Sequence, residues 1–190
     1  MKRDIAYYTI DPSDFIRGND IEQFKPDKLS CVYYLTDKNS PNKSIPKYVG
    51  KIPNKLELSE KDILTFLREI HILTSNHPSI LKLKGWSFIE NALIVTFYMK
   101  NGSLFDCIKK STKEKSFFTP TQKQIILYGV SKGIEYLHSE NIIDRDIKSS
   151  NILLDEKFYP KICDFNLSKF TSDIYSEDQS VKCYTPNYEA

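Results

Sequence analysis

The residues with the clearest capacity for chemistry lie in the run from Asp144 to Asn151, Asp-Arg-Asp-Ile-Lys-Ser-Ser-Asn, and Asp164-Phe165 follows thirteen residues after it. Phosphoryl transfer from a metal-bound nucleotide needs this mixture of groups. An acid accepts or orients the proton of the attacking hydroxyl, oxygen atoms hold a hard divalent cation, and a cation offsets the charge on the transferred group. The spacing Asp-x-Lys-x-x-Asn, then Asp-Phe, therefore indicates this chemistry more specifically than any single member does. The alternative is a polar loop assembled by chance.

Strand and helix patterns before this run describe a small α+β layer. Residues 59–73 predict a helix, because a Ser-x-x-Asp capping pattern precedes apolar residues that recur at intervals of three and four. A polar loop at residues 36–46 separates the first two strands, and a turn near residues 90–91 joins the last two into a hairpin. The predicted strands are residues 31–35, 48–52, 81–83 and 92–96.

The chain takes on helical character after residue 102. Ser103 and Asp106 can cap a short helix, and Thr119 with Pro120 begins a longer one that reaches residue 139. Apolar residues at helical spacing predict the buried face of the longer helix, which consists of Ile126, Val130, Ile134 and Leu137.

The run from Asp144 to Asn151, with Asp164-Phe165, resembles the catalytic and metal-binding loops of the eukaryotic protein kinases, His-Arg-Asp-x-Lys-x-x-Asn and Asp-Phe-Gly. Residues 48–51 are similar to the family's Val-Ala-Ile-Lys, and residues 95–104 look like its hinge, closest to the tyrosine-kinase-like branch. The resemblance implies an α+β, bilobal protein-kinase-like fold. The β-rich N-lobe, which contains one helix, would comprise about residues 1–97. The hinge would comprise residues 98–102, and an incomplete, mainly helical C-lobe would comprise residues 103–190.

The resemblance also implies a role for four residues in ATP-dependent catalysis. Lys51 would contact the α- and β-phosphates, and Glu69 would hold its ammonium in place. Asp146 would take or orient the proton of the substrate hydroxyl. Lys148 would contact the γ-phosphate, which favours a Ser or Thr acceptor on a protein substrate.

The nucleotide and its metal have their own implied residues. Asn151 and Asp164 would supply oxygens to Mg²⁺. Thr96 would stand beside the adenine as gatekeeper, while Val32, Val49 and Leu153 would sandwich the ring and the Phe97 and Met99 backbones would hydrogen-bond it. The residues expected around ATP are thus Val32, Val49, Lys51, Thr96, Phe97, Met99, Asn151, Leu153 and Asp164.

Several positions depart from the family pattern. Asp144 stands where the family has His, which removes a ring and places a carboxylate that must be paired or neutralised. Asn166 stands where it has Gly, and Asn tolerates left-handed backbone better than most residues. Lys25, Asp27 and Ser30 fall at the three glycine positions of the phosphate loop, so we expect weak nucleotide binding.

The last residues resemble the part of the kinase activation segment that precedes Pro-Glu. Arg145 would pair with a phosphorylated or acidic segment, and residues 172–182 are rich in Ser, Tyr and acids. Since the chain stops at Ala190, we expect a C-terminally truncated domain whose helix at 119–139 exposes apolar residues unless missing helices or a partner cover them. Three functions remain open: a Ser/Thr protein kinase, a pseudokinase that binds a nucleotide or partner without catalysis, and a non-functional fragment.

Composition narrows the class of protein. Lys and Arg number 27 against 25 Asp and Glu, and this near balance argues against nucleic acid or a membrane surface as the main partner. Four cysteines without a Cys-x-x-Cys favour reduced thiols, and the start lacks the apolar run of a signal peptide. No segment approaches the ~20 apolar residues that span a bilayer. We therefore expect a cytoplasmic protein without a membrane span.

Overall fold

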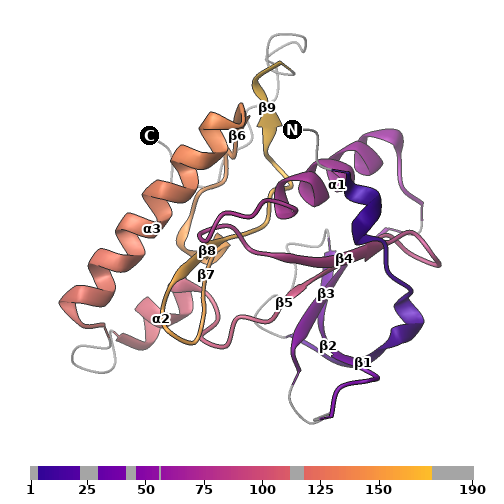
Figure 1. Ribbon diagram of the computed structural model, residues 1–190, viewed down its shortest axis with the longest axis horizontal. Coiled ribbons are helices and arrows are strands. Elements are labelled where there is room, and N and C mark those ends of the chain that lie inside the picture. Colours follow the sequence, from indigo (N-terminus) through magenta and orange to yellow (C-terminus); the bar gives the residue numbers. More distant parts are fainter. Residues whose placement is uncertain (1–3, 22–29, 42–45, 56, 112–117, 173–190) are drawn as a thin grey trace. The chain divides into compact units, whose positions relative to one another are not determined.

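The computed structural model describes residues 4–21, 30–41, 46–55, 57–111 and 118–172 (Figure 1). Its contacts divide the chain into two compact units. The first unit comprises the described residues up to Thr74 and Lys82–Tyr98. The second unit comprises Ser75–Leu81 and the described residues from Met99 onwards. Of the predicted sites, Lys25, Asp27 and the segments 173–182 and 185–190 lie outside the described residues.

The first unit is built on one antiparallel sheet with strand order β1-β2-β3-β5-β4. Successive side chains alternate between the two faces of a strand, so Tyr33 and Leu35 of the second strand point to the same face. There they pack with Tyr48, Leu93 and Val95 as the core of the unit. The strands are β1 (Phe15–Asp20), β2 (Ser30–Asp37), β3 (Tyr48–Pro53), β4 (Leu83–Ser87) and β5 (Leu93–Phe97).

Three of the four predicted strands are confirmed nearly in place, and the hairpin of β4 and β5 turns where expected, at Glu90, whose φ is 65°. The prediction for β4 was displaced, since the strand runs from Leu83 to Ser87 rather than over residues 81–83. Strand β1 was not predicted at all. The predicted fold class, α+β, is confirmed.

Helix α1 (Glu60–Leu73) carries the predicted capping box: Asp62 N–H donates to Ser59 Oγ and Ser59 N–H to Asp62 Oδ2. Its buried face contains Phe66, Ile70 and Leu73. Two short 3₁₀ turns, η1 (Ile5–Tyr8) and η2 (Pro12–Asp14), precede the sheet.

The residues before β1 lie against β4. Trp86 Nε1 donates to the Ile5 carbonyl at 2.9 Å, and Ile10 N–H donates to the Trp86 carbonyl at 3.0 Å. A Cβ at Gly85 would come within 2.3 Å of Ile10 Cγ2, so only glycine permits this approach. The segment from Ile5 to the start of β1 is therefore part of the first unit.

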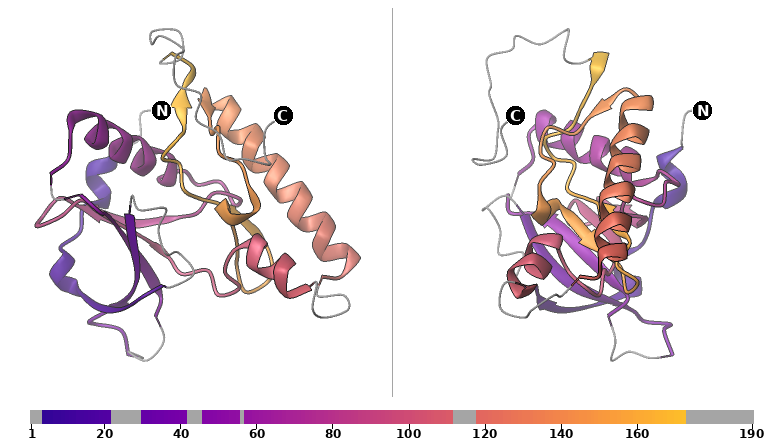
Figure 2. Two further views of the ribbon diagram at one scale, coloured as in Figure 1. Left: turned by 180° about the vertical axis from the view of Figure 1, so that it is seen from behind. Right: turned by 90° about the vertical axis from the view of Figure 1, so that its left-hand side faces the viewer.

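The second unit pairs two predicted helices with short strands. Both caps are confirmed: Asp106 N–H donates to Ser103 Oγ, and Thr119 and Gln122 form a capping box. The views of Figure 2 show the long helix running past the β7–β8 hairpin. The elements are α2 (Leu104–Ser111), α3 (Pro120–Ser139), β6 (Ile142–Ile143), η4 (Ser149–Asn151), β7 (Ile152–Leu154), β8 (Pro160–Ile162) and β9 (Lys169–Phe170).

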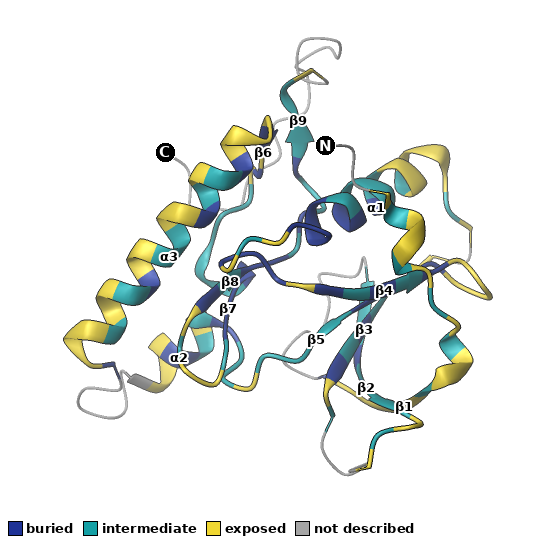
Figure 3. Cartoon of the chain, viewed as in Figure 1, coloured by how far each residue is buried: buried dark blue, intermediate teal, exposed yellow. Residues whose placement is uncertain are grey.

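The predicted face of α3 is covered more fully than its sequence suggested. Ile126 packs with Cys107, Phe118 and Leu154, and Leu137 is fully buried, so the expected exposure of this face is wrong for both. Val130 and Ile134 are half-buried. Figure 3 shows the resulting stripe, with the exposed residues of α3 on its other side. No helix among the described residues is long and apolar enough to cross a bilayer.

Candidate active site

In the first unit, strand β3 presents a lysine to a glutamate of α1. Lys51 Nζ lies 2.9 Å from Glu69 Oε1 and 3.1 Å from Oε2. Glu69 is only 4% exposed, and it precedes the fully buried Ile70 on the helix. A carboxylate at that depth is stable only when it is paired and hydrogen-bonded. The predicted pair is thus brought together.

The strand register places three more predicted residues on the face that carries Lys51. Val32 is directly opposite Lys51, and Val49 is directly opposite Thr96. Residues directly opposite one another in an antiparallel pair share a face, and residues two apart on one strand share it too. Val32, Val49, Lys51 and Thr96 therefore project from one face of the sheet, and the core of the unit occupies the other.

The two predicted hinge positions differ in their backbone contacts. The Phe97 N–H donates to the Lys82 carbonyl at 3.5 Å, and the Phe97 ring packs on Tyr48 in the first unit. Met99 belongs to the second unit, where its carbonyl accepts from Gly102 N–H at 3.0 Å. The contact of these two backbones with a base remains a prediction.

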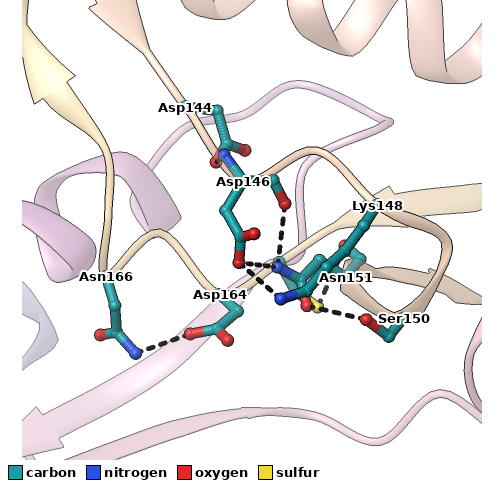
Figure 4. Close-up of polar contacts among 8 residues, drawn as sticks. Asp144, Asp146, Lys148, Ser150, Asn151, Asp164 and Asn166 are labelled. Carbon is teal, nitrogen blue, oxygen red and sulfur yellow. Dashed lines mark hydrogen bonds and ion pairs between the residues drawn. The ribbon is translucent and has the colours of Figure 1, made fainter. Parts of the chain in front are cut away.

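In the second unit, the loop before β7 gathers Asp146, Lys148 and Asn151 (Figure 4). Asp146 Oδ2 accepts a hydrogen bond from Asn151 Nδ2 and lies near Lys148 Nζ, both at 2.9 Å. Asn151 Nδ2 also donates to the Asp146 main-chain carbonyl at 3.1 Å. The 3₁₀ turn η4 explains the spacing, because Asn151 N–H donates back to the Lys148 carbonyl at 2.9 Å. A carboxylate and a cation are thus fixed side by side.

The β7–β8 hairpin brings Asp164 to this loop. Ile152 pairs with Ile162, and just beyond that pair Cys163 N–H donates to the Asn151 carbonyl at 2.9 Å. Cys163 is buried, so its side chain belongs to the core of the second unit. Asp164 itself has a φ of 63°, in the left-handed region that few non-glycine residues adopt. Leu153 of β7 is buried in the same hairpin.

Asn166 makes a contact that the sequence did not predict. Its Nδ2 donates to Asp164 Oδ1 at 2.7 Å. Asn166 does not adopt the left-handed backbone that Asn tolerates, since Asp164 and not Asn166 has the positive φ. The sequence signal that could have predicted this contact was an asparagine two residues after an aspartate, because such a spacing allows the amide to reach the carboxylate in a turn.

Asp144 is buried beneath the loop and is 5% exposed. Its Oδ1 accepts from the Asp146 N–H at 3.2 Å, and within the described residues its Oδ2 is buried without a hydrogen-bond partner. Burial raises the pKa of Asp144 to about 7, and the nearby Asp146 and Asp164 carboxylates act in the same direction. The carboxylate that the sequence expected to need neutralisation therefore keeps its proton well above the pH at which an ordinary aspartate loses it.

Arg145, next to it, has a φ of 67°, and its Nε donates to the Leu167 carbonyl at 2.7 Å. The segment that Arg145 was predicted to bind lies outside the described residues.

The oxygen atoms at Asn151 and Asp164 fit Mg²⁺. The Asn151 amide nitrogen donates to Asp146, so the carboxamide oxygen, 3.5 Å from Ser150 Oγ, is the atom that Asn151 could offer to a cation. Over the described part of the chain, no three His, Cys, Asp or Glu side chains gather as a metal site. Mg²⁺ suits such a sparse set, because one or two protein oxygens usually hold it together with phosphate and water.

Two features define the class of this protein. One is the lysine–glutamate pair between the five-stranded sheet and α1, and the other is the Asp-x-Lys-x-x-Asn loop with the aspartate that follows the β7–β8 hairpin. Its sequence matches the protein kinase domain over residues 28–190, and the chain belongs to the protein kinase family. The family predicted from the motifs is confirmed.

Relatives carry the same family name. The candidate serine/threonine-protein kinase/receptor R831 of Acanthamoeba polyphaga mimivirus is 38% identical over 140 residues, which cover 72% of this chain and 8% of that protein. The serine/threonine-protein kinase CTR1 of Arabidopsis thaliana is 33% identical over 144 residues, or 74% of this chain and 17% of CTR1. The ribosomal protein S6 kinase alpha-1 of Rattus norvegicus is 36% identical over 129 residues, or 64% of this chain and 17% of that kinase. The chain spans a small part of the length of each of these relatives.

Proposed function

We propose that this chain binds ATP with Mg²⁺ and transfers the γ-phosphoryl group to Ser or Thr hydroxyls of proteins. The observation that carries the proposal is the Asp146 carboxylate, held at 2.9 Å by both Lys148 and Asn151. A base that abstracts or orients a hydroxyl proton must be fixed in position, and a cation within reach must meet the charge of the transferred group.

Each residue of the loop has a distinct role in this proposal. Asp146 receives the proton of the acceptor hydroxyl, and Lys148 contacts the γ-phosphate, which favours a Ser or Thr acceptor. Asn151 and Asp164 hold Mg²⁺ through a carboxamide and a carboxylate oxygen. The bound cation would offset negative charge on the phosphates, which the attacking oxygen must approach.

The first unit would supply the phosphate and adenine contacts. Lys51 binds the α- and β-phosphates, and Glu69 orients its ammonium through both carboxylate oxygens. Val32 and Val49, on the same face as Lys51, pack on the adenine with Thr96 beside it, and Leu153 of the second unit contacts the ring. In this proposal the N-lobe takes up about residues 1–97, the hinge 98–102 and the incomplete C-lobe 103–190, although Ser75–Leu81 have their contacts in the second unit.

A second candidate function has its own supporting observation. Asn166 already donates to one oxygen of Asp164, and Asp144 introduces a third carboxylate near the loop. Both features alter the environment of the metal ligands and would suit a domain that binds Mg-ATP without transferring phosphate.

The decisive experiment measures incorporation of phosphate from ATP into a generic Ser/Thr protein substrate in the presence of Mg²⁺. We expect activity in the wild type, its loss in Asp146→Asn, and wild-type activity in Asp14→Asn, which makes the same change at an exposed aspartate of η2. A tyrosine-only peptide should remain unphosphorylated. Equal rates in the wild type and Asp146→Asn would overturn the enzyme proposal. A rise in melting temperature with Mg-ATP but no turnover would favour the binding function.

A further inference from the structure

Asn166 makes a short hydrogen bond to a residue assigned to the metal. The 2.7 Å from its Nδ2 to Asp164 Oδ1 lies at the short end of the range for N–H···O bonds. The segment around it is compact, because Phe165 is fully buried and Ser168 N–H donates to the Phe165 carbonyl at 3.1 Å. The contact therefore lies in an ordered turn.

The main chain on both sides of Asp164 is anchored independently of this bond. Cys163 N–H is bonded to the Asn151 carbonyl, and the buried Phe165 ring fixes the following residue. The orientation of the Asp164 carboxylate depends on its side-chain torsions. Asn166 restrains that orientation, since its amide binds one particular oxygen.

The two carboxylate oxygens of Asp164 thereby become different. In Figure 4 the Asn166 carboxamide approaches Asp164 from one side, and Asn151 lies on the other. Oδ1 is the oxygen that accepts from Asn166. Hydrogen bonds to a ligating carboxylate orient it and are known to raise metal affinity.

We propose that Asn166 is a positioning residue for the divalent cation: its amide holds Oδ1 of Asp164, so that the carboxylate would offer Oδ2 to the metal. This inference rests on the proposed function, because it assumes that Asp164 binds Mg²⁺ together with ATP. It assigns a role to a residue at which the chain departs from the family pattern.

The test measures ATP binding by calorimetry over a series of Mg²⁺ concentrations, which needs no turnover. In Asn166→Ala the Mg²⁺ concentration for half-maximal effect should rise about tenfold, the lower end of the range for lost outer-shell partners. The affinity for ATP without Mg²⁺ should not change. Asn91→Ala, the same substitution in the exposed β4–β5 turn, is the matched control and should behave as the wild type.

A double-mutant cycle separates positioning from a general structural role. If Asn166 acts through Asp164, the Asn166→Ala substitution should have no effect on Mg²⁺ dependence in an Asp164→Ala background. An unchanged Mg²⁺ dependence in Asn166→Ala, whether or not its melting temperature falls, would overturn the inference while the proposed function stands. Failure of the wild type to bind ATP at any Mg²⁺ concentration would overturn the proposed function and this inference together.

Discussion

The Lys51 ammonium lies within hydrogen-bond distance of both Glu69 carboxylate oxygens, at 2.9 and 3.1 Å. One side chain thus satisfies both acceptors of a carboxylate that α1 has buried against the sheet. The Lys51 side chain remains 20% exposed, so it is not sealed into the core. The pair combines a fixed position with access, which is the requirement for a phosphate-binding lysine.

Glu69→Gln should lower both stability and nucleotide affinity. Removing one partner of a buried pair leaves an uncompensated charge, and because Lys51 is partly exposed we expect a loss of about 1–3 kcal/mol, below the range for fully buried pairs. Urea unfolding measures the stability, and calorimetry measures Mg-ATP binding. Glu135→Gln breaks the exposed Lys132–Glu135 pair on α3 and should change neither quantity. Equal effects of the two substitutions would contradict the role of burial.

Asp144 should make stability depend on pH. Its pKa is about 7 in the folded protein against 3.8 for an ordinary aspartate, so between these values the folded state retains a proton that the unfolded state has lost. The stabilising contribution of this proton is therefore full below pH 4 and is lost as the pH rises through 7. Asp144→Asn cannot titrate and should remove the dependence.

Urea unfolding at pH 5 and pH 8 compares the stability of the wild type with that of Asp144→Asn. Relative to Asp144→Asn, the wild type should lose roughly 3 kcal/mol between these values. His77, whose pKa is lowered by burial, titrates in both proteins and cancels in the difference. Parallel stability curves for the two proteins would show that Asp144 has an ordinary pKa.

Gly129 of α3 should resist replacement although it lies within a helix. A Cβ there would come within 2.5 Å of Pro160 Cγ, and the proline ring is buried and rigid. Overpacking costs about 1–3 kcal/mol, whereas Gly→Ala in a helix gains at most about 1 kcal/mol. Gly129→Ala should therefore destabilise the protein by about 1 kcal/mol in urea unfolding.

Two other positions on α3 provide controls for this prediction. At Gly133 the closest atom is the mobile end of Ile162, Cδ1 at 2.7 Å, so Gly133→Ala should cost less than Gly129→Ala. Ser131 is exposed, and Ser131→Ala should gain a few tenths of a kcal/mol, about the difference in helix propensity. A gain of the same size at Gly129 would rule out the steric conflict.

The features that the sequence predicted depend on short-range rules. The caps at Ser59 and Thr119 are contacts over three residues, and the proximity of Asp146 to Asn151 follows from one 3₁₀ turn. Strand β1 was missed because Phe15-Ile-Arg-Gly-Asn-Asp alternates poorly, and only its pairing with β2 makes it a strand. The Asn166–Asp164 contact lies at an Asp-x-Asn spacing that is visible in the sequence, but the positive φ of Asp164 beside it is not signalled by its residue type.

Strand β1 has a consequence for how this domain can be produced. The match to the kinase family starts at residue 28, but the sheet starts at Phe15. As an edge, β1 is short, irregular between Arg17 and Asp20, and charged, and such edges discourage pairing with another molecule. A protein cut at the family boundary would instead expose β2, whose longer edge includes Cys-Val-Tyr-Tyr-Leu, and we expect it to self-associate.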